Sequence, residues 1–408
     1  MLVIPNHVSG ETASGDLVIE APVGTIIGKW ESTDTGRSFQ SFMGLQYGRV
    51  SRRFQDAEEV TQYDSPYVAQ NEGPICPQVQ GLYAVPGYVS EECLYLNIYV
   101  PDGGHDLPVM FWIHGGALIR GSGGKSWYGP EFLMDKNVVL VTINYRLGAL
   151  GFLSLENGLA PGNMGLRDQT LALKWIKRNI GSFGGNPEAI TIFGESAGSF
   201  SVMYQVVSPI SNGLFERAIA QSGAPFGPLI ESSRPGTQRQ IAHELGVHLG
   251  CLSDTDAALI SCLEAQSIED IMKTDFICQP GNICRMFPWD AVIDTYRSDP
   301  FLPSTPETIV RQGLQSKIPI MMGVTSEEGI YTASKYINDA SKFEEINEQW
   351  SFFGPLFIFD TQNPTQQESE AANQVKAFYL QDKTASMENI HDIIDMFSDI
   401  VFWVGAHR

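Results

Sequence analysis

Residues 194–198 read Gly-Glu-Ser-Ala-Gly and are the strongest chemical signal in the chain. They follow directly on the apolar run Ile190–Phe193. A serine between glycines after a buried strand is typical of a nucleophile elbow, in which a strand turns sharply into a helix. In such a turn the Ser196 hydroxyl stands exposed above the sheet, and a Cβ at either glycine would meet a neighbouring strand or helix. The pattern predicts a serine hydrolase.

A second glycine-rich turn lies upstream, where the apolar run Val109–Ile113 continues into His-Gly-Gly-Ala at residues 114–117. Glycine lets the backbone of such a turn approach a substrate closely, so that its N–H groups can donate to a developing oxyanion. The N–H of Ala197, directly after the serine, would be a further donor. Ordinary turn chemistry is the alternative, and the position upstream of an elbow favours the catalytic interpretation.

The remaining pattern predicts the elements that must hold these two turns. Short runs separated by Gly and Pro near the N-terminus predict hairpins: Leu17–Ala21, Thr25–Ile27 and Phe39–Phe42. Later apolar runs predict strands, several of them buried on both faces as in a parallel sheet: Leu94–Val100, Val109–Ile113, Val138–Ile143, Ile190–Phe193, Ala218–Ala220 and Ile318–Val324. Residues 168–179 predict a largely buried helix. Strand–helix alternation without repeats or linkers indicates one α/β domain over residues 1–408.

The composition and the motifs limit the kinds of partner that the protein can bind. The 408 residues carry 26 basic and 47 acidic side chains, a net charge of −21, which disfavours nucleic acid and anionic membranes. No run approaches a membrane span, and no signal peptide is visible at the N-terminus. The segment Gly123–Ser126 resembles the end of a phosphate-binding loop, but Ile119 stands where that loop needs glycine. His243 and His248 are one residue too far apart for a zinc helix. We therefore expect neither a metal nor a cofactor.

The six cysteines fall into three local pairs: Cys76 and Cys93, Cys251 and Cys262, and Cys278 and Cys284. Fifteen connectivities are possible, and local disulfide loops are the simplest. Disulfides would place the protein in an oxidising compartment, so that a secreted protein or one in the secretory-pathway lumen is expected. Six reduced, buried cysteines are the alternative.

At this point the chain resembles the type-B carboxylesterase and cholinesterase family of α/β-hydrolases. The resemblance rests on motifs in a fixed order: Glu91–Asn97 (Glu-Glu-Cys-Leu-Tyr-Leu-Asn), Asn163–Gln169 followed by Trp175, Phe183–Pro187 before the elbow, and Gln221–Gly223 after it. It runs from about Leu17 to the final residues. It implies an α/β-hydrolase fold, with a large, mostly parallel central sheet and helices on both faces, and hydrolysis of small-molecule carboxylic esters.

The resemblance also assigns roles to residues. Ser196 would be the nucleophile and Glu328, in Gly323–Gly329, the acid of a catalytic triad; an exposed turn carboxylate is the alternative for Glu328. The oxyanion hole would consist of Gly116, Ala117 and Ala197, with backbone donors, so that alanine where the family often has glycine is tolerated. Supporting positions would be Gly115, Glu195 and Ser222, and the family disulfides would be Cys76–Cys93 and Cys251–Cys262.

The resemblance does not assign the general base to a residue of this chain. In this hydrolase order the histidine follows the acid, and only His391 and His407 follow Glu328. His391 lies in a predicted helix, and the residues around His407 resemble a family helix rather than the histidine loop. We expect that neither is the base, that the domain lacks its C-terminal part, and that this polypeptide is inactive or nearly so.

The residues also bear on the substrate. The segment between Cys76 and Cys93 contains no tryptophan of the kind with which cholinesterases bind quaternary ammonium, so a general carboxylesterase is favoured. Glu195 stands where a juvenile-hormone-esterase elbow usually has glutamine. The rival interpretation is a non-catalytic, cholinesterase-like adhesion or binding protein, supported only by the missing histidine. The natural ester and the oligomeric state are not indicated by the sequence.

Overall fold

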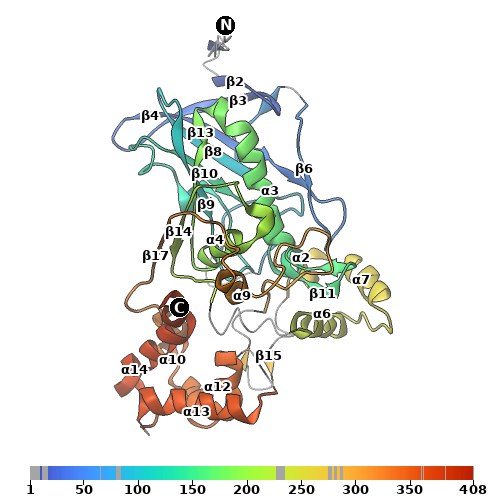
Figure 1. Ribbon diagram of the computed structural model, residues 1–408, viewed down its shortest axis with the longest axis vertical. Helices are drawn as coiled ribbons and strands as arrows, with labels where there is room; N and C mark the ends of the chain where they lie inside the picture. The colour runs from blue at the N-terminus through green and yellow to red at the C-terminus, as the bar shows by residue number, and fades with distance from the viewer. Residues whose placement is uncertain are drawn as a thin grey trace.

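The structure is a computed structural model. It describes residues 17–64, 66–79, 84–226, 235–273, 288–359, 361, 363–381 and 383–407, and the strand backbone at 10–11, 278–279 and 283–284. A twisted sheet occupies one end of the molecule, and the C-terminal helices gather at the opposite end (Figure 1).

An 11-stranded mixed sheet forms the centre of the described chain. Its order is β1-β2-β3-β4-β8-β10-β9-β13-β14-β17, with β7 beside β3. The strands are β1 Gly10–Glu11, β2 Leu17–Ala21, β3 Gly24–Ser32, β4 Ser38–Gln46, β7 Tyr67–Val68, β8 Tyr95–Pro101, β9 Leu107–Ile113, β10 Val139–Ile143, β13 Gly185–Glu195, β14 Arg217–Gln221 and β17 Ile320–Gly323. Two-stranded pairs are β5 Gly48–Arg49 with β6 Glu58–Glu59, β11 Ser154–Asn157 with β12 Ala160–Pro161, and β15 Cys278–Gln279 with β16 Ile283–Cys284.

The sheet changes character at β10. From β1 to β10 the pairs along the sheet order are antiparallel, whereas β10, β9, β13, β14 and β17 run parallel to one another. The carboxyl ends of the parallel strands therefore meet at one edge, where ligands bind in open α/β sheets. All five residues of β10 are buried, as its unbroken apolar run predicts.

Helices cover the sheet and build a second apolar body. They are α1 Lys125–Tyr128, α2 Gly148–Phe152, α3 Met164–Asn179, α4 Ala197–Val207, α6 Thr237–His248, α7 Asp256–Glu264, α8 Ile268–Ile271, α9 Pro306–Arg311, α10 Ile330–Asn338, α11 Glu344–Asn347, α12 Trp350–Phe359, α13 Gln366–Leu380, α14 Ile390–Ser398 and α15 Val404–His407. The 3₁₀-helices are η1 Ile180–Phe183, η2 Pro209–Ser211, η4 Ala340–Phe343 and η5 Met387–Asn389, and η6 Asp399–Trp403 is a π-helix. Helix α4 packs against β13 and β14.

The buried apolar side chains of the described residues form three clusters: a large one around the sheet, a second one among the C-terminal helices, and a small third one that includes Tyr99 and Trp112. The second cluster runs from Ala333 to Val401 and includes stacked rings of Tyr336 and Phe397. All six predicted strands are present, and α3 carries the buried face expected of residues 168–179. The assignment of the whole chain to one domain stays a prediction.

The last of the predicted strands is not among those buried on both faces. The run Ile318–Val324 forms only the short β17, and three of its four residues are exposed. Met321 is 67% exposed. The reason is position, because β14 is the only strand that β17 pairs with in the described part of the chain.

Two of the expected disulfides are formed, Cys76–Cys93 and Cys251–Cys262. The third pair lies outside the described residues, since nothing of the Cys278 and Cys284 side chains is described. Within the described ranges, no helix combines the length and apolar character needed to cross a bilayer.

Candidate active site

The backbone at Ser196 is held in an unusual conformation. Ser196 lies between the end of β13 and the start of α4 with φ 54° and ψ −125°. Such positive φ is uncommon for a residue with a Cβ and persists only where the surroundings enforce it. Here the Ser196 N–H donates to the carbonyl of Gln221 on neighbouring β14 at 2.9 Å, and the Ser196 carbonyl accepts from Phe200 N at 3.0 Å. The strained turn predicted from the sequence is confirmed.

The flanking glycines are required by close backbone contacts. A Cβ at Gly198 would lie 2.0 Å from the carbonyl oxygen of Ile113 in β9, and one at Gly194 would lie 2.6 Å from the same oxygen. No side-chain movement relieves a clash with a neighbouring strand. The elbow therefore works because α4 begins directly against β9, and only glycine permits that approach.

The turn after β9 packs against the serine. A Cβ on Gly115 would lie 2.6 Å from the carbonyl oxygen of Glu195 and 3.2 Å from the Cβ of Ser196. Gly116 has φ +110°, and Ala117 and Leu118 also have positive φ, at 56° and 60°. The backbone thus coils tightly beside the serine, in the arrangement that can aim N–H groups at an oxyanion.

Glu328 reaches the same place from a different element. It lies in the turn between β17 and α10, where its Oε1 accepts a hydrogen bond from Thr325 N at 2.7 Å. The next residue, Gly329, donates from its N–H to Ser398 Oγ at 2.7 Å, and a Cβ there would lie 2.0 Å from the carbonyl oxygen of Ile394. The turn is thereby fixed to α14. The adjacent Glu327 is exposed and does not line the pocket.

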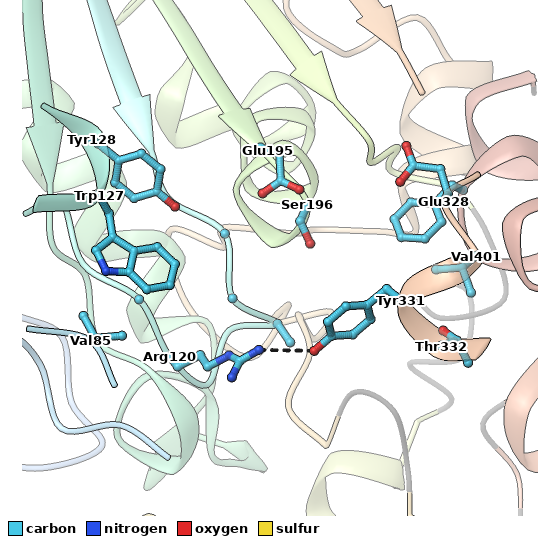
Figure 2. Close-up of a pocket in the computed structure, with 15 residues that line it drawn as sticks. Val85, Arg120, Trp127, Tyr128, Glu195, Ser196, Glu328, Tyr331, Thr332 and Val401 are labelled. Carbon is cyan, nitrogen blue, oxygen red and sulfur yellow. Dashed lines mark hydrogen bonds between the residues drawn. The ribbon is translucent and has the colours of Figure 1, made fainter. Parts of the chain in front are cut away.

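These elements enclose a pocket of about 320 Å³. Figure 2 shows Ser196 and Glu195 at its top, Glu328 at one side and Arg120, Trp127 and Tyr128 at the other. Gly115, Gly116 and Ala117 also line it, together with Val85, Gly121, Tyr331, Thr332, Val401 and Phe402. The structure thus gathers into one cavity six residues predicted from segments more than 200 positions apart.

Two ionisable groups beside Ser196 have altered pKa values. The pKa of Glu195 is raised by burial of its carboxylate and further by the negative charge of Glu328, although the open pocket leaves Glu195 access to solvent. The pKa of Tyr128 is raised to about 12 by burial and by Glu195. Both pKa values are raised because burial and neighbouring negative charge disfavour the ionised forms of Glu195 and Tyr128.

His114 is the first residue of the glycine-rich turn, and its side chain is buried. It is fully buried, its ring stacks on Tyr145 at 4.4 Å, and its Nδ1 lies 2.8 Å from the carbonyl oxygen of Gly115. Burial lowers its pKa to about 4, so the ring is neutral at physiological pH. Its Nε2 has no hydrogen-bond partner among the described residues. His114 supports the turn from behind and does not line the pocket.

Other predicted residues lie at or beyond the edge of this arrangement. Ala197 is the buried first residue of α4, and Ser222, with φ 59°, lies after β14 and donates from its N–H to Gly323 O at 2.8 Å. Neither lines the pocket. His391 and His407 are exposed on α14 and α15, and no histidine of the described ranges lines the cavity.

Several pocket residues were not predicted. Arg120 comes from the loop after β9, Trp127 and Tyr128 from the end of α1, and Tyr331 from the start of α10, and no motif marks these positions. The only signal was their position: Arg120 follows the His-Gly-Gly-Ala turn, and Tyr331 follows Glu328 by three residues.

The chain resembles known proteins along nearly its whole length. The model of the carboxylesterase family matches residues 15–408. The chain is 36% identical over 397 residues to venom carboxylesterase-6 of Apis mellifera, covering 94% of this chain and 70% of the relative. It is 32% identical to juvenile hormone esterase of Tribolium castaneum over 94% of this chain and 68% of the relative. With acetylcholinesterase of Bungarus fasciatus it shares 37% identity over 78% of this chain and 54% of the relative.

Among solved structures, juvenile hormone esterase from Manduca sexta with covalently attached OTFP matches with a TM-score of 0.83 at 29% identity, over 96% of this chain and 74% of that one. The fold is that of an α/β-hydrolase, as predicted. The chain therefore belongs to the carboxylesterase family and is a carboxylic ester hydrolase.

Proposed function

We propose that Ser196 is the nucleophile of a two-step acyl transfer. Its Oγ attacks the ester carbonyl carbon and its proton passes to a general base; the C–O bond then breaks, and the alcohol leaves with that proton. Water attacks the acyl-enzyme in the second step, returning the acid and the free serine. The N–H groups of Gly116, Ala117 and Ala197 hold the oxyanion in both steps, and Glu328 orients the base.

One observation carries this proposal: the packing of the glycine-rich turn directly on the strained serine. Gly115 contacts Ser196 and Glu195, and Gly116, Ala117 and Glu328 line the same cavity. Positive φ at Ser196, Ala117 and Leu118 side by side supports this proposal, because strained backbone is enriched at active sites. Gly115 and Glu195 support the turn, and Ser222 supports the elbow from β14. The two disulfides favour a secreted or lumenal protein.

The general base is proposed to be absent from the described residues. His391 and His407 lie on exposed helix surfaces outside the cavity. Loss of one triad member lowers the rate by about 10⁴-fold or more, so the 408 residues by themselves should hydrolyse esters very slowly.

The test is covalent labelling with a fluorophosphonate, followed by peptide mass spectrometry. Labelling is expected at Ser196, to be slow, to disappear in Ser196→Ala, and to accelerate when free imidazole supplies a base. His391→Ala and His407→Ala should leave its rate unchanged. Labelling at another residue would contradict the nucleophile, and a large loss in either histidine variant would identify the base that we exclude. A protein that binds esters but is never labelled, even with imidazole, would instead support the non-catalytic binding role.

A further inference from the structure

Arg120 brings a positive charge to the wall of the pocket. Its Nη2 donates to the Tyr331 Oη at 3.2 Å, and both side chains line the cavity (Figure 2). Within the ranges that the structure describes, Arg120 forms no ion pair. Most other described arginines do, as Arg146 does with Asp168 at 2.6 Å. In a chain with a net charge of −21, an arginine that faces a cavity without a carboxylate partner is unusual.

The backbone fixes where this charge stands. Arg120 N donates to Gly116 O at 3.1 Å, so that the arginine closes the same turn that borders Ser196. The next residue, Gly121, exchanges two hydrogen bonds with the buried side chain of Gln78, at 3.0 and 3.1 Å. The backbone at Arg120 is therefore held on both sides, and the hydrogen bond to Tyr331 Oη restrains the guanidinium end of the side chain.

The Arg120 guanidinium has N–H groups that Tyr331 does not use. Of its five N–H groups, one is used by Tyr331, and the remainder can address a carboxylate in a bidentate geometry. Tyr331 Oη accepts from Arg120 and keeps its own proton to donate. Arg120 and Tyr331 thus present a pair of donors on the cavity wall.

The other charges in the cavity determine how an anionic substrate would be oriented. Glu195 and Glu328 line the cavity together with Ser196, and the pKa of Glu195 is raised by burial and further by the negative charge of Glu328. A second carboxylate on a substrate would be repelled from that side and attracted to Arg120. Only the uncharged ester group can then lie at the serine.

We propose that Arg120, with Tyr331, makes the pocket selective for esters whose remote end carries a carboxylate, such as half-esters of linear dicarboxylic acids. The proposal rests on the proposed function of Ser196 and deepens it by naming the substrate class. Arg120 is a specificity residue in this scheme, because it contacts the remote end of the substrate and takes no part in the acyl transfer.

The test compares two amide ligands, which are hydrolysed far more slowly than the corresponding esters and have acyl chains of equal length. They are the mono-4-nitroanilide of glutaric acid and the 4-nitroanilide of pentanoic acid, and their binding is measured by titration calorimetry or ligand-observed NMR. Arg120→Gln is expected to weaken the carboxylate ligand by about 10- to 100-fold, the range for a charged hydrogen bond, and the neutral ligand by less than about 2-fold. Tyr331→Phe should weaken the carboxylate ligand by about 3- to 10-fold. Succinic and adipic homologues would show which chain length spans the serine and Arg120.

Arg217→Gln is the matched control, since Arg217 is exposed at the start of β14 and its loss changes the net charge equally. It should alter neither affinity. Equal effects of Arg120→Gln on both ligands, no effect on the charged one, or failure of the charged ligand to bind would overturn the proposal. A second readout separates this from the proposed function: charge-selective binding without labelling of Ser196 contradicts only the nucleophile, whereas labelling of Ser196 without charge selectivity contradicts only the role of Arg120.

Discussion

The two walls of the pocket stand on different parts of the sheet. Ser196 and the glycine-rich turn stand on β9 and β13, strands that are paired on both sides in the centre of the parallel sheet. Glu328 follows β17, which is mostly exposed and pairs with β14 alone in the described chain. Both walls include a close backbone contact, since a Cβ at Gly198 or at Gly329 would lie 2.0 Å from a carbonyl oxygen. Gly198 packs against a central strand, whereas Gly329 packs against α14 and forms one hydrogen bond to Ser398 Oγ.

This difference implies that the serine wall has a fixed geometry, whereas the Glu328 wall can adjust. Close packing against a strand in the centre of the sheet leaves the elbow one conformation, as an attacking hydroxyl and its oxyanion donors require. A carboxylate that only orients a base tolerates a looser support. We therefore expect substitutions on the serine wall to affect folding strongly, and those on the Glu328 wall to have smaller effects.

The largest expected effect is that of Gly198→Ala. Its Cβ would lie 2.0 Å from Ile113 O, so β9 and α4 must separate, and we expect a loss of about 3–4 kcal/mol in the free energy of unfolding. The matched control is Gly323→Ala at the end of β17, where a Cβ meets nothing within 4 Å. Urea denaturation of both variants measures the contrast. Similar losses at the two positions would remove the distinction between the walls.

The next effect is a pH dependence from His114. Because burial lowers its pKa from 6.5 to about 4, the unfolded chain binds the proton more tightly, and stability falls as the pH drops from 6.5 to 4. The contribution is about 3 kcal/mol over that window. His114→Phe keeps a ring against Tyr145 without a titrating group and should flatten the curve. Urea midpoints measured between pH 7 and pH 4 test this; parallel curves for both proteins would show that His114 does not titrate as inferred.

The same contrast explains what the sequence could predict. Residues 194–198 and 114–117 form continuous motifs because each follows one buried strand, so strand, turn and backbone strain are all encoded locally. Glu328 needed the family resemblance, since an acidic residue in a turn has no local signature. Arg120, Tyr128 and Tyr331 escaped prediction because their shared cavity is created only when β9, α1 and α10 meet in space. The exposure of β17 likewise depends on its neighbours and not on its apolar residues.

On the Glu328 wall, Ser398→Ala should cost about 1–2 kcal/mol. The substitution removes the acceptor of the Gly329 N–H in a buried site, where Ser398 is 2% exposed, and leaves that donor without a partner. Thermal or urea unfolding gives the loss. Ser334→Ala, whose hydroxyl donates to Tyr331 O on an exposed face of α10, is the control and should change stability by less than about 0.5 kcal/mol. A loss equal to that of Gly198→Ala would make this wall as rigid as the other.

The smallest effect joins the two walls through charge. Glu195 has its pKa raised by burial and by Glu328, so the folded state binds the proton more tightly than the unfolded one, and the charged form opposes folding as the pH rises above 4.5. Glu195→Gln should therefore stabilise the protein at pH 7 by less than about 1 kcal/mol, because solvent screens the open pocket, and should not stabilise it below pH 4. Glu328→Gln should lower the pKa of Glu195, measured by carboxyl-carbon NMR. Glu327→Gln, one residue away but outside the cavity, should lower it less. Equal shifts from the two variants would mean that Glu328 does not face Glu195 across the pocket.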